Sequence, residues 1–127
     1  MSSYIKAALQ RFNHPIPTKL QYSPFPHTPP NYSAKVKYTK EPDTTEILNQ
    51  RGKKFIQRVS GTLIYLAHAV DITILNLLSS VASQQYKPTA TTKNRTLQIL
   101  EYVSTQEEVF LTYSRSQMTL AMHSDAV

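Results

Sequence analysis

The side chains of this sequence that could do chemistry are few, and the most suggestive pair lies near its end. His123 and Asp125 are two residues apart in a stretch of alternating apolar and polar residues, so both should project from one face of a strand. Imidazole and carboxylate groups are metal-ligand types, but an exposed polar chain end is the interpretation we favour. The other aspartates, Asp43 and Asp71, fall in a linker and at the start of a helix. The sequence therefore predicts no cluster of carboxylates.

Composition excludes several classes of mechanism. The chain has no cysteine, which excludes disulfides, thiolate zinc sites and cysteine nucleophiles. It has only two glycines, so it contains no glycine-rich phosphate loop. No spacing of histidine, serine and acid suggests a nucleophilic triad. The first residues form no apolar leader, and we expect an intracellular location in the cytoplasm or nucleus.

Positive charge is the property with the clearest functional meaning. Up to Arg58, ten Lys and Arg residues stand against three acids, a net charge of +7, whereas from Val59 onward four stand against five, a net charge of −1. A basic half beside a near-neutral half indicates contact with a polyanion such as nucleic acid, and a solvated basic segment is the equally weighted alternative. The candidates for phosphate contact in the helical region are Lys53, Lys54, Arg58, Lys93 and Arg95.

A proline-rich segment separates a short amino-terminal helix from the rest of the chain. Residues 2–13 place Ile5, Ala8, Leu9 and Phe12 on one helical face. Seven of the eight prolines lie between Pro15 and Pro42, so 15–45 is predicted to be an irregular, disordered linker. We favour a solvated linker over single-strand stacking for its interleaved aromatic and basic residues, which are Tyr22, Tyr32, Tyr38, Lys19, Lys35, Lys37 and Lys40.

Three helices and two strands are predicted after the linker. Apolar residues recur at helical spacing over 49–70, over 72–86 with Asp71 as the cap, and up to about residue 104 after a cap at Thr91 or Thr92. The period changes to two over 109–113 and 118–124, which favours a hairpin. The apolar run 59–82 is long enough to span a membrane, but Asp71 near its middle would cost about 2.5–3.5 kcal/mol there. The predicted fold class is therefore mainly α with a small β part (α+β).

Gly61 interrupts the first of these helices. A glycine inside a helix costs about 1 kcal/mol relative to alanine, so its presence usually marks a close approach of two backbones. We expect Gly61 to allow tight packing against the following helix rather than direct contact with nucleic acid.

The order of several short motifs resembles copia-type retrotransposon polyproteins, between the end of the reverse transcriptase and the start of ribonuclease H. Gly61-Thr-Leu-Ile-Tyr-Leu-Ala67 followed by Asp71 is similar to the helix pair beyond the polymerase palm. Leu97-Gln-Ile-Leu-Glu-Tyr-Val-Ser-Thr105 resembles a later helix of that family. Leu111-Thr-Tyr113 and His123-Ser-Asp-Ala126 resemble strands of its ribonuclease H. The family's proline beside the Asp71 position is missing here.

This resemblance implies a domain division and a set of roles. The units would be a short helix (1–14), the linker (15–45), a connection-like helical module (46–105) and the truncated start of a ribonuclease H-like domain (106–127). Asp125 would be the first ribonuclease H carboxylate, and the motif positions Gly61, Tyr65, Asp71 and Tyr102 would be structural. Ribonuclease H uses two metal ions held by several carboxylates, and one carboxylate is too few. We therefore expect Mg²⁺ to serve the intact polyprotein and no cofactor to serve this chain.

The chain also lacks a Tyr-x-Asp-Asp polymerase motif, so the function implied is that of a non-catalytic remnant with residual template–primer binding. The expected partner is an RNA–DNA or DNA duplex and not a membrane. The alternative is a protein-interaction module whose apolar helices are completed by a partner, with the proline-rich segment as a ligand for aromatic grooves.

Overall fold

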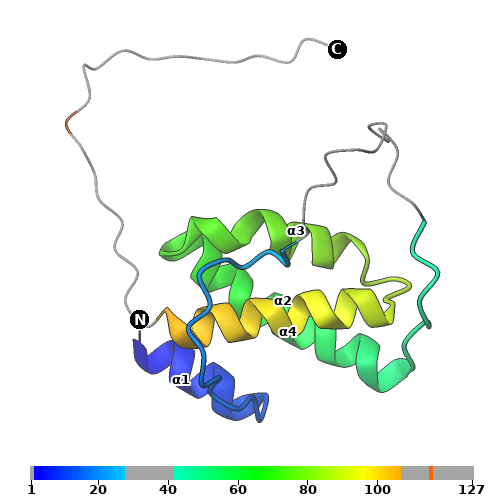
Figure 1. Ribbon diagram of the computed structural model, residues 1–127, viewed down its shortest axis with the longest axis horizontal. Coiled ribbons are helices and arrows are strands. Elements are labelled where there is room, and N and C mark those ends of the chain that lie inside the picture. Colours follow the sequence, from blue (N-terminus) through cyan, green and yellow to red (C-terminus); the bar gives the residue numbers. More distant parts are fainter. Residues whose placement is uncertain (1, 28–41, 107–114, 116–127) are drawn as a thin grey trace.

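The computed structural model describes residues 2–27, 42–106 and 115, and the described part of the chain is helical (Figure 1). The elements, in chain order, are α1 (Ser2–Arg11), α2 (Gln50–Ala69), the 3₁₀ turn η1 (Ile72–Ile74), α3 (Leu75–Ser83) and α4 (Ala90–Thr105). The predicted mainly helical class is confirmed. The predicted strands over 109–113 and 118–124 lie outside the described residues.

Local sequence sets the ends of the first two helices. Asn13 adopts the left-handed conformation with φ of 49°, and His14 N donates to Leu9 O at 3.0 Å while Asn13 N donates to Gln10 O at 3.1 Å. This pair of bonds is the Schellman arrangement that closes helix ends, so α1 ends before the proline is reached. At the start of α2, Asn49 Oδ1 accepts from Gly52 N at 2.9 Å.

The capping residue of η1 was predicted correctly, and that of α4 was not. Asp71 caps η1 as predicted, because its carboxylate accepts from Thr73 N at 3.1 Å. The cap of α4 is Thr89, so the prediction of Thr91 or Thr92 was wrong. Thr92 instead occupies the third helical position and completes a reciprocal capping box with Thr89, which satisfies two amide groups at once.

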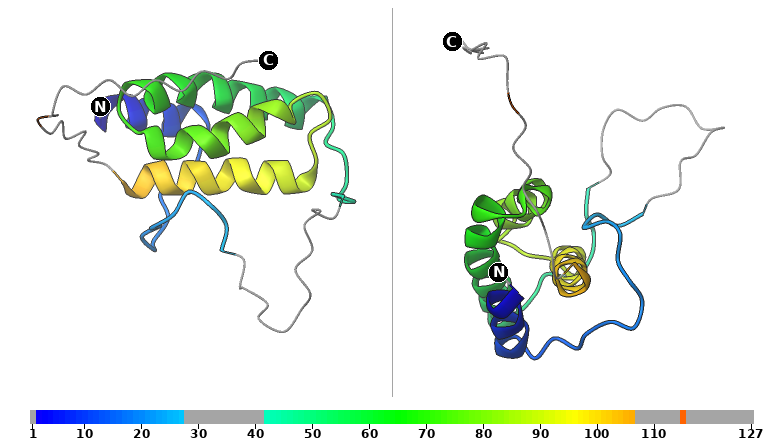
Figure 2. Two further views of the ribbon diagram at one scale, coloured as in Figure 1. Left: turned by 90° about the horizontal axis from the view of Figure 1, so that it is seen from above. Right: turned by 90° about the vertical axis from the view of Figure 1, so that its left-hand side faces the viewer.

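One apolar core joins all four helices. α2 and α3 are connected through η1 and pack together, and α4 packs against both (Figures 1 and 2). α1 contributes Ile5 and Leu9 to the same core. Side chains exposed by 2% or less fill the centre: Ile56, Val59, Leu63, Leu66, Ile74, Leu78, Val81, Ile99 and Leu100.

α1 lies antiparallel to α2. Near its start, Tyr4 Oη donates to Thr62 O at 2.6 Å and its ring lies 5.6 Å from that of Tyr65. Near its end, the Phe12 ring meets the Phe55 ring edge-on, with centroids 6.0 Å apart and planes at 84°. Edge-to-face pairs of this kind are favourable beyond the area they bury. These contacts fix the position of α1 along α2.

The described part of the predicted linker is held against α4. Residues 15–27 form neither helix nor strand, and Figure 1 shows them crossing α4. Gln106 Nε2 donates to Gln21 O at 2.9 Å, Gln21 N donates to Thr105 Oγ1 at 3.2 Å, and Gln98 Nε2 donates to Ser23 O at 3.2 Å. We call this segment the strap. The rest of the predicted linker up to residue 41, with Tyr32 and Tyr38, lies outside the described residues.

A second attachment joins the chain before α2 to the start of α4. Asp43 accepts from Thr89 Oγ1 at 2.6 Å and from Thr45 Oγ1 at 2.7 Å, while Leu48 N donates to Pro88 O at 2.8 Å. Hydrogen bonds from the Thr89 hydroxyl, and then from the hydroxyl and backbone amide of Thr45, lower the pKa of the Asp43 carboxyl from 3.8 to about 2. A carboxylate is also well placed at the amino end of a helix, where the peptide dipoles favour negative charge.

The two glycines have different surroundings. A Cβ added to Gly52 would lie 2.9 Å from Leu48 Cβ, whereas a Cβ added to Gly61 would meet nothing within 4 Å. The close packing expected at Gly61 is therefore not found. Gly52 lies in the first turn of α2, and it is the glycine at which an added side chain would collide with Leu48.

We predict that Gly61→Ala raises the free energy of unfolding by about 1 kcal/mol, because alanine costs less conformational entropy in a helix and the space is open. Gly52→Ala is the matched control, since it carries the same gain in helix propensity but has to displace Leu48. Urea unfolding followed by circular dichroism measures both. Equal stabilisation by the two substitutions would contradict this account of the glycines.

We predict a second effect on stability, at low pH. The pKa of Asp43 is depressed in the folded chain, so its ionised form stabilises the fold fully above about pH 4, and this contribution is lost as the pH falls from about 4 to 2. Asp43→Asn should therefore lose stability at neutral pH and come closer to the wild type as the pH falls through that window. Unfolding curves at several pH values test this, and a difference between the two proteins that stays constant with pH would refute it.

Candidate nucleic-acid interface

α2 carries a stripe of cations on the side away from its buried face. Arg51, Lys54 and Arg58 follow spacings of three and four residues, which places them in one row along a helix. The buried residues of α2 that face α3 and α4, such as Ile56, Val59 and Leu63, occupy the other side. Packing of the core thus directs the three cations outward as a group.

α1 brings a fourth cation to this stripe. A groove of about 350 Å³ between α1 and α2 is lined by Arg11, Phe12, Arg51, Lys54, Phe55 and Arg58. We call it the α1–α2 groove. Arg11 stands at the last turn of α1, beside Phe12, and the Phe12–Phe55 contact sets how α1 approaches α2. The groove therefore combines four cations with two aromatic rings.

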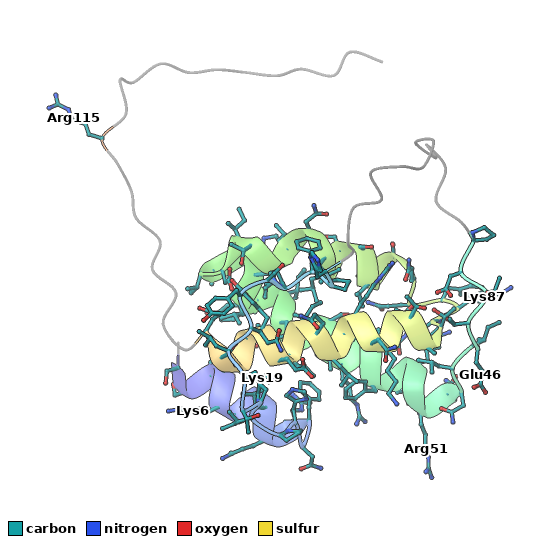
Figure 3. The ribbon with its side chains drawn as sticks, viewed as in Figure 1. Lys6, Lys19, Glu46, Arg51, Lys87 and Arg115 are labelled. Carbon is teal, nitrogen blue, oxygen red and sulfur yellow. The ribbon has the colours of Figure 1, made fainter. Side chains whose placement is uncertain are left out.

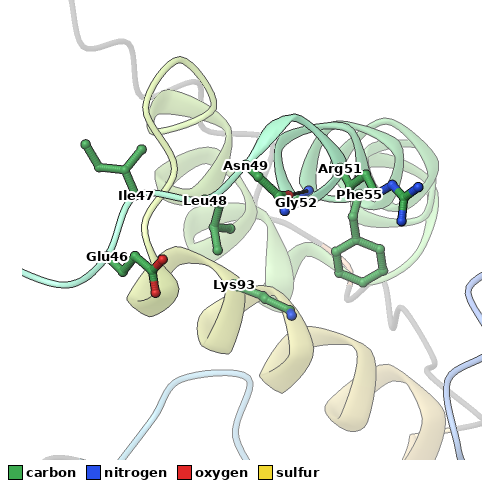
Figure 4. Close-up of a pocket in the computed structure, with 8 residues that line it drawn as sticks. All are labelled: Glu46, Ile47, Leu48, Asn49, Arg51, Gly52, Phe55 and Lys93. Atoms are coloured by element: carbon green, nitrogen blue, oxygen red, sulfur yellow. Dashed lines mark hydrogen bonds between the residues drawn. The ribbon is translucent and has the colours of Figure 1, made fainter.

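A neighbouring groove of about 670 Å³ extends this surface toward the start of α4. Its lining residues are Glu46, Ile47, Leu48, Asn49, Arg51, Gly52, Phe55 and Lys93 (Figure 4). We call it the α2–α4 groove. Figure 4 shows Lys93 projecting from α4, while Arg51 and Phe55 come from α2. Arg51 and Phe55 line both grooves, so the two grooves adjoin at these residues.

The cations of these grooves are not neutralised by the described carboxylates. Arg11, Arg51, Lys54, Arg58 and Lys93 form no ion pair within 4.0 Å with any residue that the structure describes. Figure 3 shows Arg51 extending away from the body of the molecule, and Glu46 is the acid that lines the α2–α4 groove. A surface of uncompensated positive charge in a depression attracts polyanions.

The structure brings some of the predicted phosphate contacts together and separates others. Lys54 and Arg58 line the α1–α2 groove and Lys93 lines the α2–α4 groove. Lys53 lies outside both grooves, with its ammonium 5.2 Å from the centroid of the Tyr86 ring. Arg95 lines neither groove. The two grooves therefore contain three of the five predicted residues.

Sequence reasoning missed Arg11 and Arg51. Arg51 was detectable, because it precedes Lys54 and Arg58 at the spacing that forms one helical row. Arg11 was not, because its position depends on how α1 packs against α2, more than forty residues later in the chain.

The motif positions expected to be structural have varied roles. Asp71 is buried, and its carboxylate also accepts from Thr73 Oγ1. Thr73 Oγ1 in turn lies 3.3 Å from Tyr102 Oη, which links α4 to η1. Tyr65 is 59% exposed and contacts Tyr4, so it supports α1 rather than the core. Gly61 lines a shallow groove beside α1.

Among the described residues, the histidines and carboxylates form no assembled site. Asp125 and His123 lie outside the described residues. Within the described ranges, no three or more His, Asp or Glu side chains come close enough together to hold a metal ion. His14 is half-buried, and burial lowers its pKa despite the opposing charge of Glu101. Its Nε2 makes no hydrogen bond within the described part.

Comparison with known proteins gives no further assignment. The chain matches no protein-family model, no curated protein and no solved structure. Among the described helices, none combines the length and the apolar character needed to cross a membrane. The basic grooves are therefore the feature of this chain from which a function can be inferred.

Proposed function

We propose that this chain is a non-catalytic nucleic-acid-binding protein, a remnant of a copia-type reverse transcriptase and ribonuclease H polyprotein. The observation that supports binding is the α1–α2 groove, where four cations converge without ion-pair partners among the described residues. The motifs between Gly61 and Thr105 support the origin, because they follow the family's order.

The arrangement suits a phosphate backbone better than a single anion. Arg51, Lys54 and Arg58 extend along two turns of α2, which is about 10 Å at 1.5 Å per residue. Successive phosphates in one strand are several ångströms apart, so a row of cations can contact more than one of them. Contacts of this type give affinity without sequence preference and release bound counterions.

The family resemblance suggests where this surface would lie in an intact polyprotein. In the intact polyprotein the helical module would connect the polymerase to ribonuclease H, whose carboxylates would hold Mg²⁺. We propose no hydrolysis by this chain, because Asp125 would supply only one of the several carboxylates that ribonuclease H needs. Nucleic-acid binding is the property that remains, and in the intact polyprotein its ligand would be the template–primer.

The alternative is a protein-interaction module. The strap favours it, because Ile16 and Tyr22 are 72% and 83% exposed and Leu20 is 50% exposed. An apolar interface responds weakly to salt, whereas log affinity for nucleic acid falls linearly with log salt. A salt titration therefore separates the two functions.

We predict that Lys54→Gln/Arg58→Gln weakens nucleic-acid binding and lowers the salt slope by about 0.7–0.9 for each phosphate contact removed. The matched control is Lys87→Gln/Arg95→Gln, which removes the same charges from residues outside both grooves. Fluorescence anisotropy with a labelled oligonucleotide at several salt concentrations measures both effects. Equal losses in the two double variants would show that net charge, and not the groove, determines binding. Absence of binding at low salt would refute the proposed function.

A further inference from the structure

Phe55 lies where the two basic grooves meet. It lines both of them, and so does Arg51, the residue on the preceding turn of α2. Arg11, Lys54 and Arg58 lie on one side of this ring and Lys93 lies on the other. An aromatic ring with cations around it can bind a flat group by stacking, in addition to packing against the core.

The ring is held in place and remains partly accessible. Phe12 meets it edge-on at 6.0 Å, and the two rings pack against the common apolar core. Phe55 is half-buried, so part of its surface faces the grooves. A ring fixed in this way gives up little conformational freedom when another flat group stacks on it.

A partly exposed ring between two grooves favours an unpaired base over a duplex. In a duplex the bases are stacked inside and the surface presents phosphates and sugars, so no base face is free to stack on the Phe55 ring. In a single strand each base can leave its neighbours and enter a groove, and volumes of about 350 and 670 Å³ lie within the range of small-molecule pockets. Bases of any sequence can stack on an aromatic ring.

We propose that the grooves bind single-stranded nucleic acid, with a base stacked on Phe55 and the neighbouring phosphates held by the cations around it. This inference rests on the proposed function and narrows its ligand from nucleic acid in general to an unpaired strand. It differs from the duplex expected from the family resemblance. It also places stacking in the helical module rather than at the tyrosines of the linker.

The first test varies the ligand. Full-length protein is titrated with oligothymidylate, with an abasic strand of the same length and charge, and with a duplex of that length. We expect about tenfold weaker binding of the abasic strand, within the effect of losing one stacked base, and weaker binding of the duplex as well. Equal affinity for the thymidine and abasic strands, or tighter binding of the duplex, would overturn the inference while leaving the proposed function intact. Failure to bind all three ligands would remove both.

The second test varies the ring. Phe55→Leu keeps an apolar side chain but removes the stacking surface, and Phe55→Tyr keeps the ring. We expect Phe55→Leu to lose about tenfold in affinity for oligothymidylate and nothing for the abasic strand, and Phe55→Tyr to bind both like the wild type. Thermal unfolding confirms that each variant is folded. A misfolded Phe55→Leu protein would lose affinity for both strands, so an equal loss for the two would contradict the stacking role.

Discussion

The rest of this structure depends on which face of α2 is turned toward the core. Ile56, Val59 and Leu63 are almost completely buried, so only one orientation of the helix satisfies the core. That orientation turns Arg51, Lys54 and Arg58 away from the core together, because they occupy the opposite side of the same helix. The apolar residues thus determine where the charge lies, although they contact no ligand.

α1 converts this charged stripe into a groove. Its contacts with α2 are aromatic at both ends, through Tyr4 with Tyr65 and Phe12 with Phe55, and its apolar face joins the common core. A helix of ten residues is marginally stable alone, so α1 depends on this packing. Fold stability and the binding surface are consequently coupled through the same ring contacts.

Much of the helical fold was predictable from sequence, and the site was predictable only in part. The spacing of apolar residues identified all four helical regions, and Asp71 was recognised as a cap because an acidic residue preceded an apolar run. The cap of α4 was misplaced because three threonines lie close together and local sequence did not rank them. The expectation for Gly61 failed because a glycine in a helix indicates close packing only on average. The convergence of Arg11 on α2 is a tertiary property, and no local pattern contains it.

The strap and the Asp43 attachment together close a loop on a single helix. Ser23 is joined to Gln98 and Asp43 to Thr89, positions about 13 Å apart along α4 at 1.5 Å per residue. The chain between these two anchors therefore starts and ends on the same rigid rod, whatever path it takes. For a flexible segment anchored at both ends, each doubling of its length adds only about 0.6 kcal/mol of closure entropy. Because both anchors lie on one helix, they hold the two ends of this segment without constraining how α4 packs against α2 and α3.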